Sequence, residues 1–234
     1  MSVQLPLALR WPAQQRFETF VVGDNAAAVA LVRQASVDNS SWVFASGPAG
    51  SGKTHLLIAA CAATSGHDRS AQYLSLAKLP GDRGSAIRSF GGSDLLALDD
   101  VDAIAGDADA EHALFDLYNR CKMEKSTLLF AAGKPPAQTG IGLPDLVSRL
   151  SACAQATLKP LDDAARREAV RQRAQARGLV LDDTVLDWLF AHTQRDLGSL
   201  SALIERLDRE SLAAKRRITL PFLRQLLESE KNNG

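Results

Sequence analysis

One eight-residue segment constrains this chain more than any other. Residues 47–54 read Gly-Pro-Ala-Gly-Ser-Gly-Lys-Thr, a complete G-x-x-x-x-G-K-T phosphate-binding loop. In such a loop the glycines let backbone N–H groups turn inward around a phosphate, the lysine brings positive charge to the outer phosphates, and the threonine hydroxyl binds Mg²⁺. We therefore expect a bound nucleotide and Mg²⁺. The predicted contacts are Gly47, Pro48, Ala49, Gly50, Ser51, Gly52, Lys53, Thr54 and His55.

The segments on both sides of the loop have the order that such a site requires. Residues 41–46 form a short β-rich run, and residues 55–61 are apolar with strong helix formers. A strand, the loop and a helix therefore follow one another, and the helix adds its positive N-terminal end to the anion site. The alternative is a glycine-rich turn without a ligand, but such a turn has no need for the Lys-Thr pair.

An aliphatic run, residues 95–98, is followed directly by two carboxylates, Asp99 and Asp100. Downstream of a phosphate loop, Asp99 is expected to hold Mg²⁺ through water, and Asp100 is expected to orient or deprotonate the attacking water. Asp102, in contrast, is expected to be a solvated turn or cap residue.

The periodicity of the remaining chain predicts the fold class. Strands are predicted at 71–76, 127–132 and 156–158, and helices at 110–125 and 146–150. Because strands alternate with helices, the sheet should be parallel, α/β in class and covered by helices.

The composition shifts at residues 159–161, and the chain then looks all helical, with later helices starting at about Asp183, Asp196 and Pro221. The arginines between 166 and 177 are interrupted by acidic residues, which favours a solvated face over a phosphate-backbone contact. The sequence thus predicts an extended arm over 1–12, an α/β nucleotide domain over 13–159 and a helical domain over 160–234.

Composition excludes several classes of protein. Lys and Arg number 27, as do Asp and Glu, so no basic field points to sequence-specific DNA binding. Three cysteines lack metal-ligand spacing, which favours small buried side chains in a reducing compartment. We find no signal peptide and no window that approaches a membrane span, and therefore expect a cytoplasmic protein.

These motifs together resemble the AAA+ modules of DnaA-type proteins. The similar segments are residues 17–25, 52–57, 98–101 and 142–150. The resemblance implies an AAA+ P-loop fold with a C-terminal helical lid, ADP or ATP as the cofactor, and Val22 and Asn25 beside the base. It also implies that Arg149 is an arginine finger that acts on ATP held by a neighbouring DnaA subunit; a local salt bridge is the alternative for this residue.

Within that family the chain resembles the Hda-type regulators that inactivate DnaA. Residues 4–9 are similar to their sliding-clamp-binding hexapeptide, and residues 115–120, 135–136 and 207–211 also match. The resemblance implies a negative regulator of replication initiation that docks on the DNA polymerase sliding clamp through Gln4, Leu5, Leu7 and Leu9. An apolar arm tucked against its own domain is the alternative. The DNA-binding helix-turn-helix domain of DnaA is expected to be absent, and self-association is left open.

Two departures from the family pattern concern the γ-phosphate. Gly133 occupies the position where the family usually has a polar residue that senses the γ-phosphate. Gly198 occupies the position of the family's lid arginine, so Arg195 would have to take over the role of that arginine. Tight diphosphate binding with weak intrinsic hydrolysis is therefore expected. An autonomous ATPase of the helicase-loader or transposition-helper type remains the main alternative, and a DnaA-type DNA-binding module is a third.

Overall fold

The computed structural model of this chain describes residues 11–38, 41–192, 200, 203–204 and 206–208. The chain divides into two compact units, Met1–Lys159 and Pro160–Gly234. The first unit contains a five-stranded sheet with the order β2-β3-β4-β1-β5, and all neighbouring strands are parallel. The predicted fold class is thus confirmed. The strands are β1 (Val43–Ser46), β2 (Ala71–Ser75), β3 (Leu95–Asp99), β4 (Thr127–Ala132) and β5 (Ala154–Thr157).

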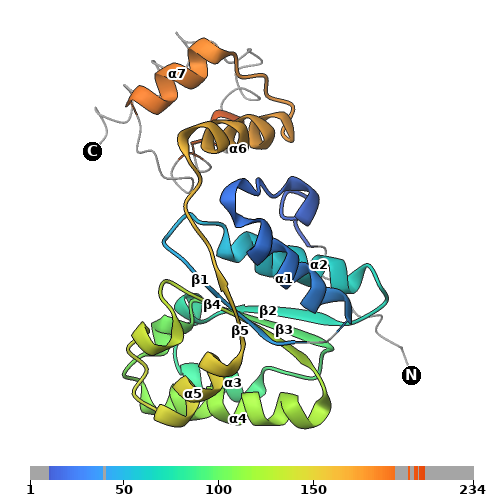
Figure 1. The fold of residues 1–234 in the computed structure, drawn as a ribbon, viewed down its shortest axis with the longest axis vertical. Coiled ribbons are helices and arrows are strands. Elements are labelled where there is room, and N and C mark those ends of the chain that lie inside the picture. Colours follow the sequence, from blue (N-terminus) through green and yellow to red (C-terminus); the bar gives the residue numbers. More distant parts are fainter. Residues whose placement is uncertain (1–10, 39–40, 193–199, 201–202, 205, 209–234) are drawn as a thin grey trace. The chain divides into compact units, whose positions relative to one another are not determined.

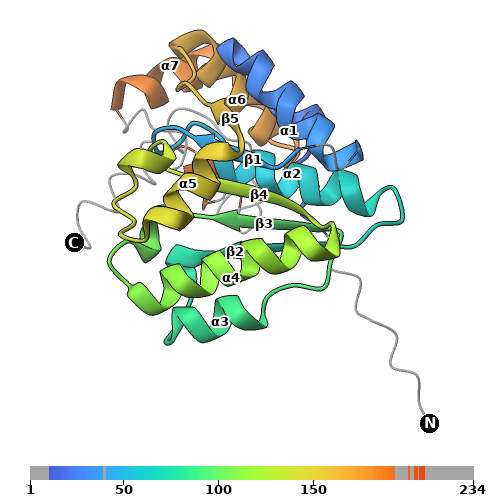
Figure 2. The ribbon, with the colours of Figure 1, turned by 60° about the horizontal axis from the view of Figure 1, so that its bottom comes forward.

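Helices cover both faces of this sheet (Figures 1 and 2). The helices α1 and α2 lie on one face, and α3, α4 and α5 lie on the other. Every residue of β1, β3 and β4 is buried, which explains their continuous apolar runs. The bounds are α1 (Ala26–Asp38), α2 (Lys53–Ser65), α3 (Arg83–Ser89), α4 (Ala108–Glu124) and α5 (Pro144–Ala152).

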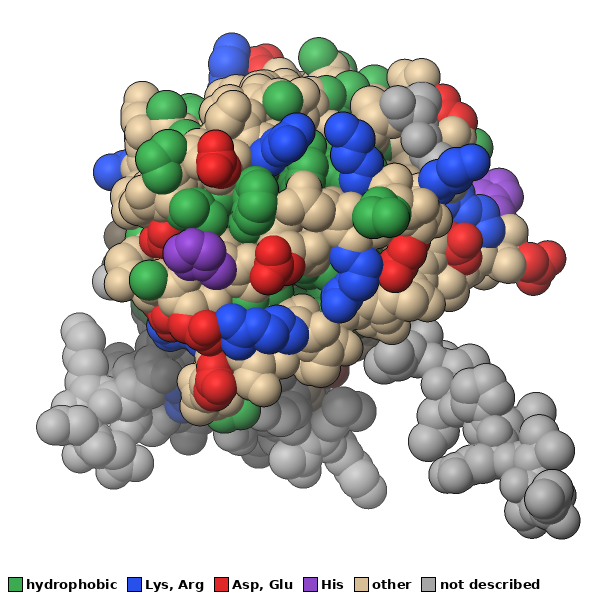
Figure 3. Space-filling model, turned by 90° about the horizontal axis from the view of Figure 1, so that it is seen from below, with side chains coloured by type: hydrophobic (Ala, Val, Ile, Leu, Met, Phe, Trp, Pro, Cys, Tyr) green, Lys and Arg blue, Asp and Glu red, His purple; other side chains and the backbone are tan. Residues whose placement is uncertain are grey.

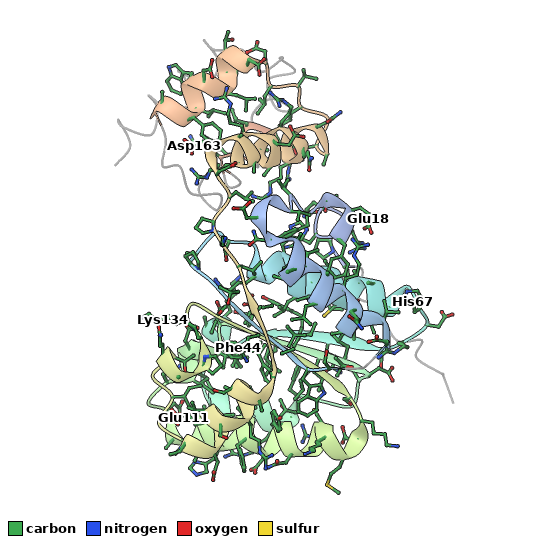
Figure 4. All side chains as sticks on the ribbon, in the orientation of Figure 1. Glu18, Phe44, His67, Glu111, Lys134 and Asp163 are labelled. Atoms are coloured by element: carbon green, nitrogen blue, oxygen red, sulfur yellow. The ribbon has the colours of Figure 1, made fainter. Side chains whose placement is uncertain are left out.

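Successive side chains of β1 point to opposite faces of the sheet and enter two different apolar clusters. Val43 and Ala45 join the apolar cluster under α1 and α2, whereas Phe44 joins the cluster under α4 and α5. Phe44, labelled in Figure 4, packs against Phe130 of β4 with ring centroids 6.4 Å apart. Because all five strands are parallel, their carboxyl ends meet at one edge of the sheet, and loops at that edge form the usual ligand site of such folds.

Short 3₁₀ helices complete the first unit. They are η1 (Phe17–Thr19), η2 (Gly23–Asn25), η3 (Leu76–Lys78), η4 (Val101–Ile104) and η5 (Pro136–Gln138). The segments η1 and η2 precede α1, and η4 begins two residues after the end of β3. Residues 1–10, which include the predicted clamp-binding hexapeptide, lie outside the described residues.

The second unit contains α6 (Asp163–Gln175) and α7 (Asp183–His192). Asp162 caps α6 by accepting a hydrogen bond from the backbone N–H of Ala165 at 2.7 Å. An apolar cluster joins both helices to Leu200, Ile204 and Leu207. The predicted helix starts at Asp196 and Pro221 lie outside the described residues.

The arginines of α6, expected to form a solvated face between acidic residues, also form ion pairs. Arg166 pairs with Asp163 at 2.9 Å, and Arg167 pairs with Asp187 of α7. Arg171 contacts both Glu168, at 3.1 Å, and Asp183, at 2.7 Å. Arg167 and Arg171 therefore join α6 to α7, whereas Arg166 pairs within α6.

The surface over α3 and α4 carries both signs of charge. Figure 3 shows Lys and Arg side chains interspersed with Asp and Glu on this face. No helix in the described part of the chain has the length and the apolar character needed to cross a membrane. The three cysteines are buried, and this burial raises the pKa of Cys61 and Cys153 to about 12 and that of Cys121 to about 11.

Candidate nucleotide site

The phosphate loop joins the carboxyl end of β1 to the first residue of α2. Gly50 and Gly52 adopt positive φ angles of 75° and 98°, a region that side chains disfavour. A Cβ at Gly52 would also meet the Phe20 ring at 2.6 Å, and one at Gly47 would meet the carbonyl oxygen of Leu158 at 2.5 Å. Glycine is therefore required here both by the backbone conformation and by the closeness of neighbouring atoms.

The groups of the loop fit an anionic ligand. Lys53 begins α2, and its Nζ donates hydrogen bonds to the carbonyl oxygens of Gly47 at 2.6 Å and Pro48 at 3.0 Å. The ammonium group is thereby held against the loop. The Ser51 hydroxyl is buried and has no hydrogen-bond partner among the described residues. An orphaned hydroxyl, a lysine and a helix N-terminus are the donors that a phosphate group would use.

Thr54 and Asp99, the two predicted Mg²⁺ ligands, lie in contact. The Thr54 hydroxyl donates to Asp99 Oδ2 at 2.5 Å, and the Tyr73 hydroxyl donates to the same oxygen at 2.8 Å. Mg²⁺ is commonly held by one or two protein oxygens together with substrate phosphates. No group of three or more His, Cys, Asp or Glu side chains in the described residues is arranged to hold a metal by itself. The Thr54–Asp99 pair thus fits a metal that arrives with a nucleotide.

The charge on Asp99 is opposed by its burial. Asp99 is 1% exposed, and burial raises the pKa of its carboxyl, with the nearby charge of Asp100 acting in the same direction. Hydrogen bonds from Thr54 and Tyr73 lower the pKa but do not cancel the effect of burial. A divalent cation at this position would remove the electrostatic cost of the buried charge.

Asp100, the predicted catalytic carboxylate, sits immediately after β3 in a left-handed conformation with φ 57°. The Ser75 hydroxyl donates to Asp100 Oδ2 at 2.7 Å, and the backbone N–H of Asp100 donates to Asp99 Oδ1 at 3.0 Å. Ser75 and Tyr73 were not anticipated from sequence. Both lie on β2, which pairs with β3, and because they are two residues apart they share one face of that strand.

Asp102, predicted to be a solvated turn or cap residue, is partly exposed and lies in η4. Its Oδ2 also accepts a hydrogen bond from the backbone N–H of Gly133 at 3.0 Å. This bond, which the sequence did not indicate, links the segments that follow β3 and β4.

The segment before α1 packs on the loop and on α2. The Phe20 ring contacts Gly52 and meets His55 edge to face, with ring centroids 5.1 Å apart. His55 Nε2 lies 2.8 Å from the carbonyl oxygen of Arg16. Phe20 was not among the predicted site residues. His55 is buried, so its predicted contact with a nucleotide stays a prediction.

Val22 and Asn25, predicted to lie beside the base, differ in their surroundings. Val22 is 36% exposed. Asn25 is buried, and its amide exchanges two hydrogen bonds with the backbone of Lys159, at 2.7 and 3.1 Å. Asn25 thus ties η2 to the exit of β5, and its contact with a nucleotide stays a prediction.

Arg149 lies away from the loop of its own chain. Its guanidinium is 5.9 Å from the ring centroid of Tyr118, which itself packs edge to face with Trp42 at 4.5 Å. Trp42 directly precedes β1, whereas the phosphate loop follows the other end of that strand. Arg149 is exposed, and no carboxylate of the described residues forms an ion pair with it. The local salt bridge that was the alternative for this residue is therefore not seen.

Comparisons with known proteins identify the family of this chain. Residues 12–157 match the family model of the bacterial DnaA ATPase domain, and residues 163–227 match that of the Hda lid domain. Domain III of DnaA from Thermotoga maritima is 21% identical with a TM-score of 0.77, and the alignment covers 94% of this chain and 98% of that one.

Two further solved structures share the fold. AMPPCP-bound DnaA from Aquifex aeolicus is 22% identical, with a TM-score of 0.71 and coverage of 95% of this chain and 70% of that one. The RuvB Holliday junction branch migration motor of Thermotoga maritima is 16% identical, with a TM-score of 0.62 and coverage of 88% and 68%. With its ATPase region and lid both matched, this chain belongs to the DnaA-type AAA+ proteins and is related to Hda.

Proposed function

We propose that this chain is a DnaA-related regulator of replication that binds an adenine nucleotide, docks on the sliding clamp and stimulates hydrolysis of ATP held by DnaA. The observation that carries the proposal is the succession of the two family matches, a DnaA ATPase region followed by an Hda lid. The nucleotide part draws further support from Aquifex aeolicus DnaA, which binds AMPPCP.

The loop and β3 would hold the nucleotide. Backbone N–H groups of residues 49–54 would surround the α- and β-phosphates. Lys53 would exchange hydrogen bonds to the loop carbonyls for bonds to the outer phosphates. Mg²⁺, when bound, would neutralise phosphate charge at the Thr54–Asp99 pair. Tyr73 orients that carboxylate by donating its hydroxyl hydrogen.

Arg149 would act on a neighbouring subunit. Its guanidinium lies toward the edge of the sheet opposite the chain's own loop and is free of ion pairs with described carboxylates. An arginine with this exposure is available to a second nucleotide site, here that of DnaA. In that site it would stabilise the charge that develops on the transferred phosphoryl group.

The arm would dock on the clamp through Gln4, Leu5, Leu7 and Leu9, which lie outside the described residues. The segment next to the arm is fixed to the nucleotide domain. Trp11 Nε1 donates to the Ser65 hydroxyl of α2 at 3.0 Å, and the Arg16 guanidinium donates to the carbonyl oxygens of Trp11 and Pro12, both at 3.0 Å. Docking through residues 4–9 would therefore also fix the position of this domain.

The test measures hydrolysis of DnaA-bound ATP in the presence of DNA-loaded clamp. Arg149→Ala should lose the stimulation, by a factor on the order of 10³, and should retain ADP and clamp binding. Arg149→Lys is the matched control for charge: it keeps a cation but lacks the planar fork, and it should also lose most of the stimulation. Full stimulation by Arg149→Ala would refute the finger assignment.

An autonomous ATPase is the second candidate. It is favoured by the placement of Asp100, whose carboxylate is held by Ser75 at the end of β3 as a water-activating group would be. The same assay separates the two functions. If the chain alone hydrolyses ATP rapidly and DnaA has no influence, the autonomous function is correct.

A further inference from the structure

A carboxylate occupies the place where a side chain at position 133 would project. Asp102 Oδ2 lies 3.0 Å from the backbone nitrogen of Gly133. A Cβ built on Gly133 would also lie 3.0 Å from this oxygen, closer than ordinary van der Waals contact. A side chain at position 133 would therefore require the Asp102 carboxylate to shift.

This pair lies beside the phosphate loop. Gly133 directly follows Ala132, whose carbonyl oxygen accepts a hydrogen bond from the backbone N–H of Gly47 at 3.3 Å. Asp102 follows Asp99 and Asp100 by only a few residues, at the end of the neighbouring strand β3. In a site of this kind the terminal phosphate lies at these strand ends, beside Lys53 and the Mg²⁺ ligands.

The charge of Asp102 is not compensated in the described structure. No Lys, Arg or His of the described residues lies within ion-pair distance of its carboxylate. Lys134, labelled in Figure 4, follows Gly133 and is exposed to solvent. Three carboxylates lie at this edge of the sheet. Asp99 accepts a hydrogen bond from the Thr54 hydroxyl, and Asp100 accepts one from Ser75. Asp102 adds a third negative charge where a γ-phosphate would arrive.

We propose that Asp102 is a specificity-determining residue that makes the site prefer a nucleoside diphosphate over a triphosphate. It does so by repelling the γ-phosphate from the position next to Gly133. The inference rests on the proposed nucleotide binding and adds to it the group that sets the ratio of the two affinities. A purely structural Asp102, which only ties η4 to β4, would leave that ratio unchanged.

Asp102→Asn separates charge from structure, because the amide oxygen still accepts the hydrogen bond from Gly133. Isothermal titration calorimetry on the full chain with Mg²⁺ gives Kd for ADP and for ATP. We expect Asp102→Asn to tighten ATP binding about fivefold relative to ADP, as removal of one nearby charge in a partly hydrated site implies. The gain should shrink at high ionic strength, which a structural role would not produce.

Asp116→Asn is the matched control, since it removes the same charge from an exposed position on α4. It should leave the ratio of the two Kd values unchanged. An unchanged ratio in Asp102→Asn, or equal weakening of ADP and ATP, overturns the role of Asp102 and leaves the proposed nucleotide binding intact. A parent chain that binds neither ADP nor ATP overturns both.

Discussion

Glu111 offers a sharp test of how the helix of Arg149 is held in place. This residue of α4 is 3% exposed, and its carboxylate accepts hydrogen bonds from the backbone N–H groups of Gly106 at 2.9 Å, Gly142 at 3.0 Å and Leu143 at 2.8 Å. Gly142 and Leu143 lead directly into Pro144, the first residue of α5. Figure 4 labels Glu111 at this end of α4.

The cost of removing the carboxylate follows from these bonds. Hydrogen bonds to a charged group contribute about 1.5–3 kcal/mol each, but water can replace part of this at the exposed Gly106 and Gly142. We therefore expect Glu111→Ala to lower the free energy of unfolding by about 3 kcal/mol. Glu111→Gln keeps one acceptor oxygen and should cost about 2 kcal/mol.

Amide hydrogen exchange measures this effect where it arises. In Glu111→Gln, the amides of Gly142 and Leu143 should exchange about 30-fold faster, the factor that corresponds to about 2 kcal/mol of local opening. Glu124→Gln, the same substitution at the end of the same helix, is the control. If the exchange of Gly142 and Leu143 is unaltered in Glu111→Gln, the carboxylate does not hold the α5 entry.

Three further predictions concern the loop and the arm. Lys53→Ala should abolish ADP binding in calorimetry while its circular dichroism remains that of a folded protein, and retained affinity would exclude the loop as the binding site. Gly52→Ala should lower stability by about 2 kcal/mol in urea unfolding and weaken ADP binding, because its φ is positive and its Cβ would meet Phe20; parent-like values would contradict the strain argument. Replacing both Gln4 and Leu5 with Ala should remove clamp binding in a surface-plasmon assay without a change in melting temperature. If clamp affinity survives, the hexapeptide is an apolar segment that does not bind the clamp.

The parts of the site that sequence could predict are those made by contiguous residues. The phosphate loop is one uninterrupted segment, and Asp99 and Asp100 follow an aliphatic run directly, so local order was sufficient to identify them. The parallel α/β class followed for the same reason, because alternation of strands and helices is also visible along the chain.

The residues that sequence missed act across strands. Tyr73 and Ser75 contact the aspartates only because β2 lies next to β3, and Asp102 reaches Gly133 only because β3 lies next to β4. Strand order cannot be derived from the periodicity of a single strand. Asp102 was therefore predicted to be a solvated turn residue, since nothing in its local sequence indicates a neighbour 31 positions away.

The buried charge of Asp99 should make the site less stable than its neutral form, which gives a prediction with a definite sign. Burial raises the pKa of Asp99 in the folded chain above its ordinary value. The folded state therefore takes up a proton more readily than the unfolded state, and above both pKa values the charge destabilises the fold. Asp99→Asn carries no charge and should melt higher than the parent at neutral pH in EDTA. The gain should be on the order of 1 kcal/mol, or about 2–4 °C.

The difference should shrink as the pH falls through the raised pKa of Asp99 and should vanish below the ordinary carboxyl range, where the parent is protonated as well. Differential scanning calorimetry across that range checks both points. Because the amide cannot replace the carboxylate as an Mg²⁺ ligand, the same variant should lose the Mg²⁺-dependent part of its nucleotide affinity. A lower melting temperature of Asp99→Asn at neutral pH would mean that the hydrogen bonds from Thr54, Tyr73 and the backbone of Asp100 outweigh the cost of burial.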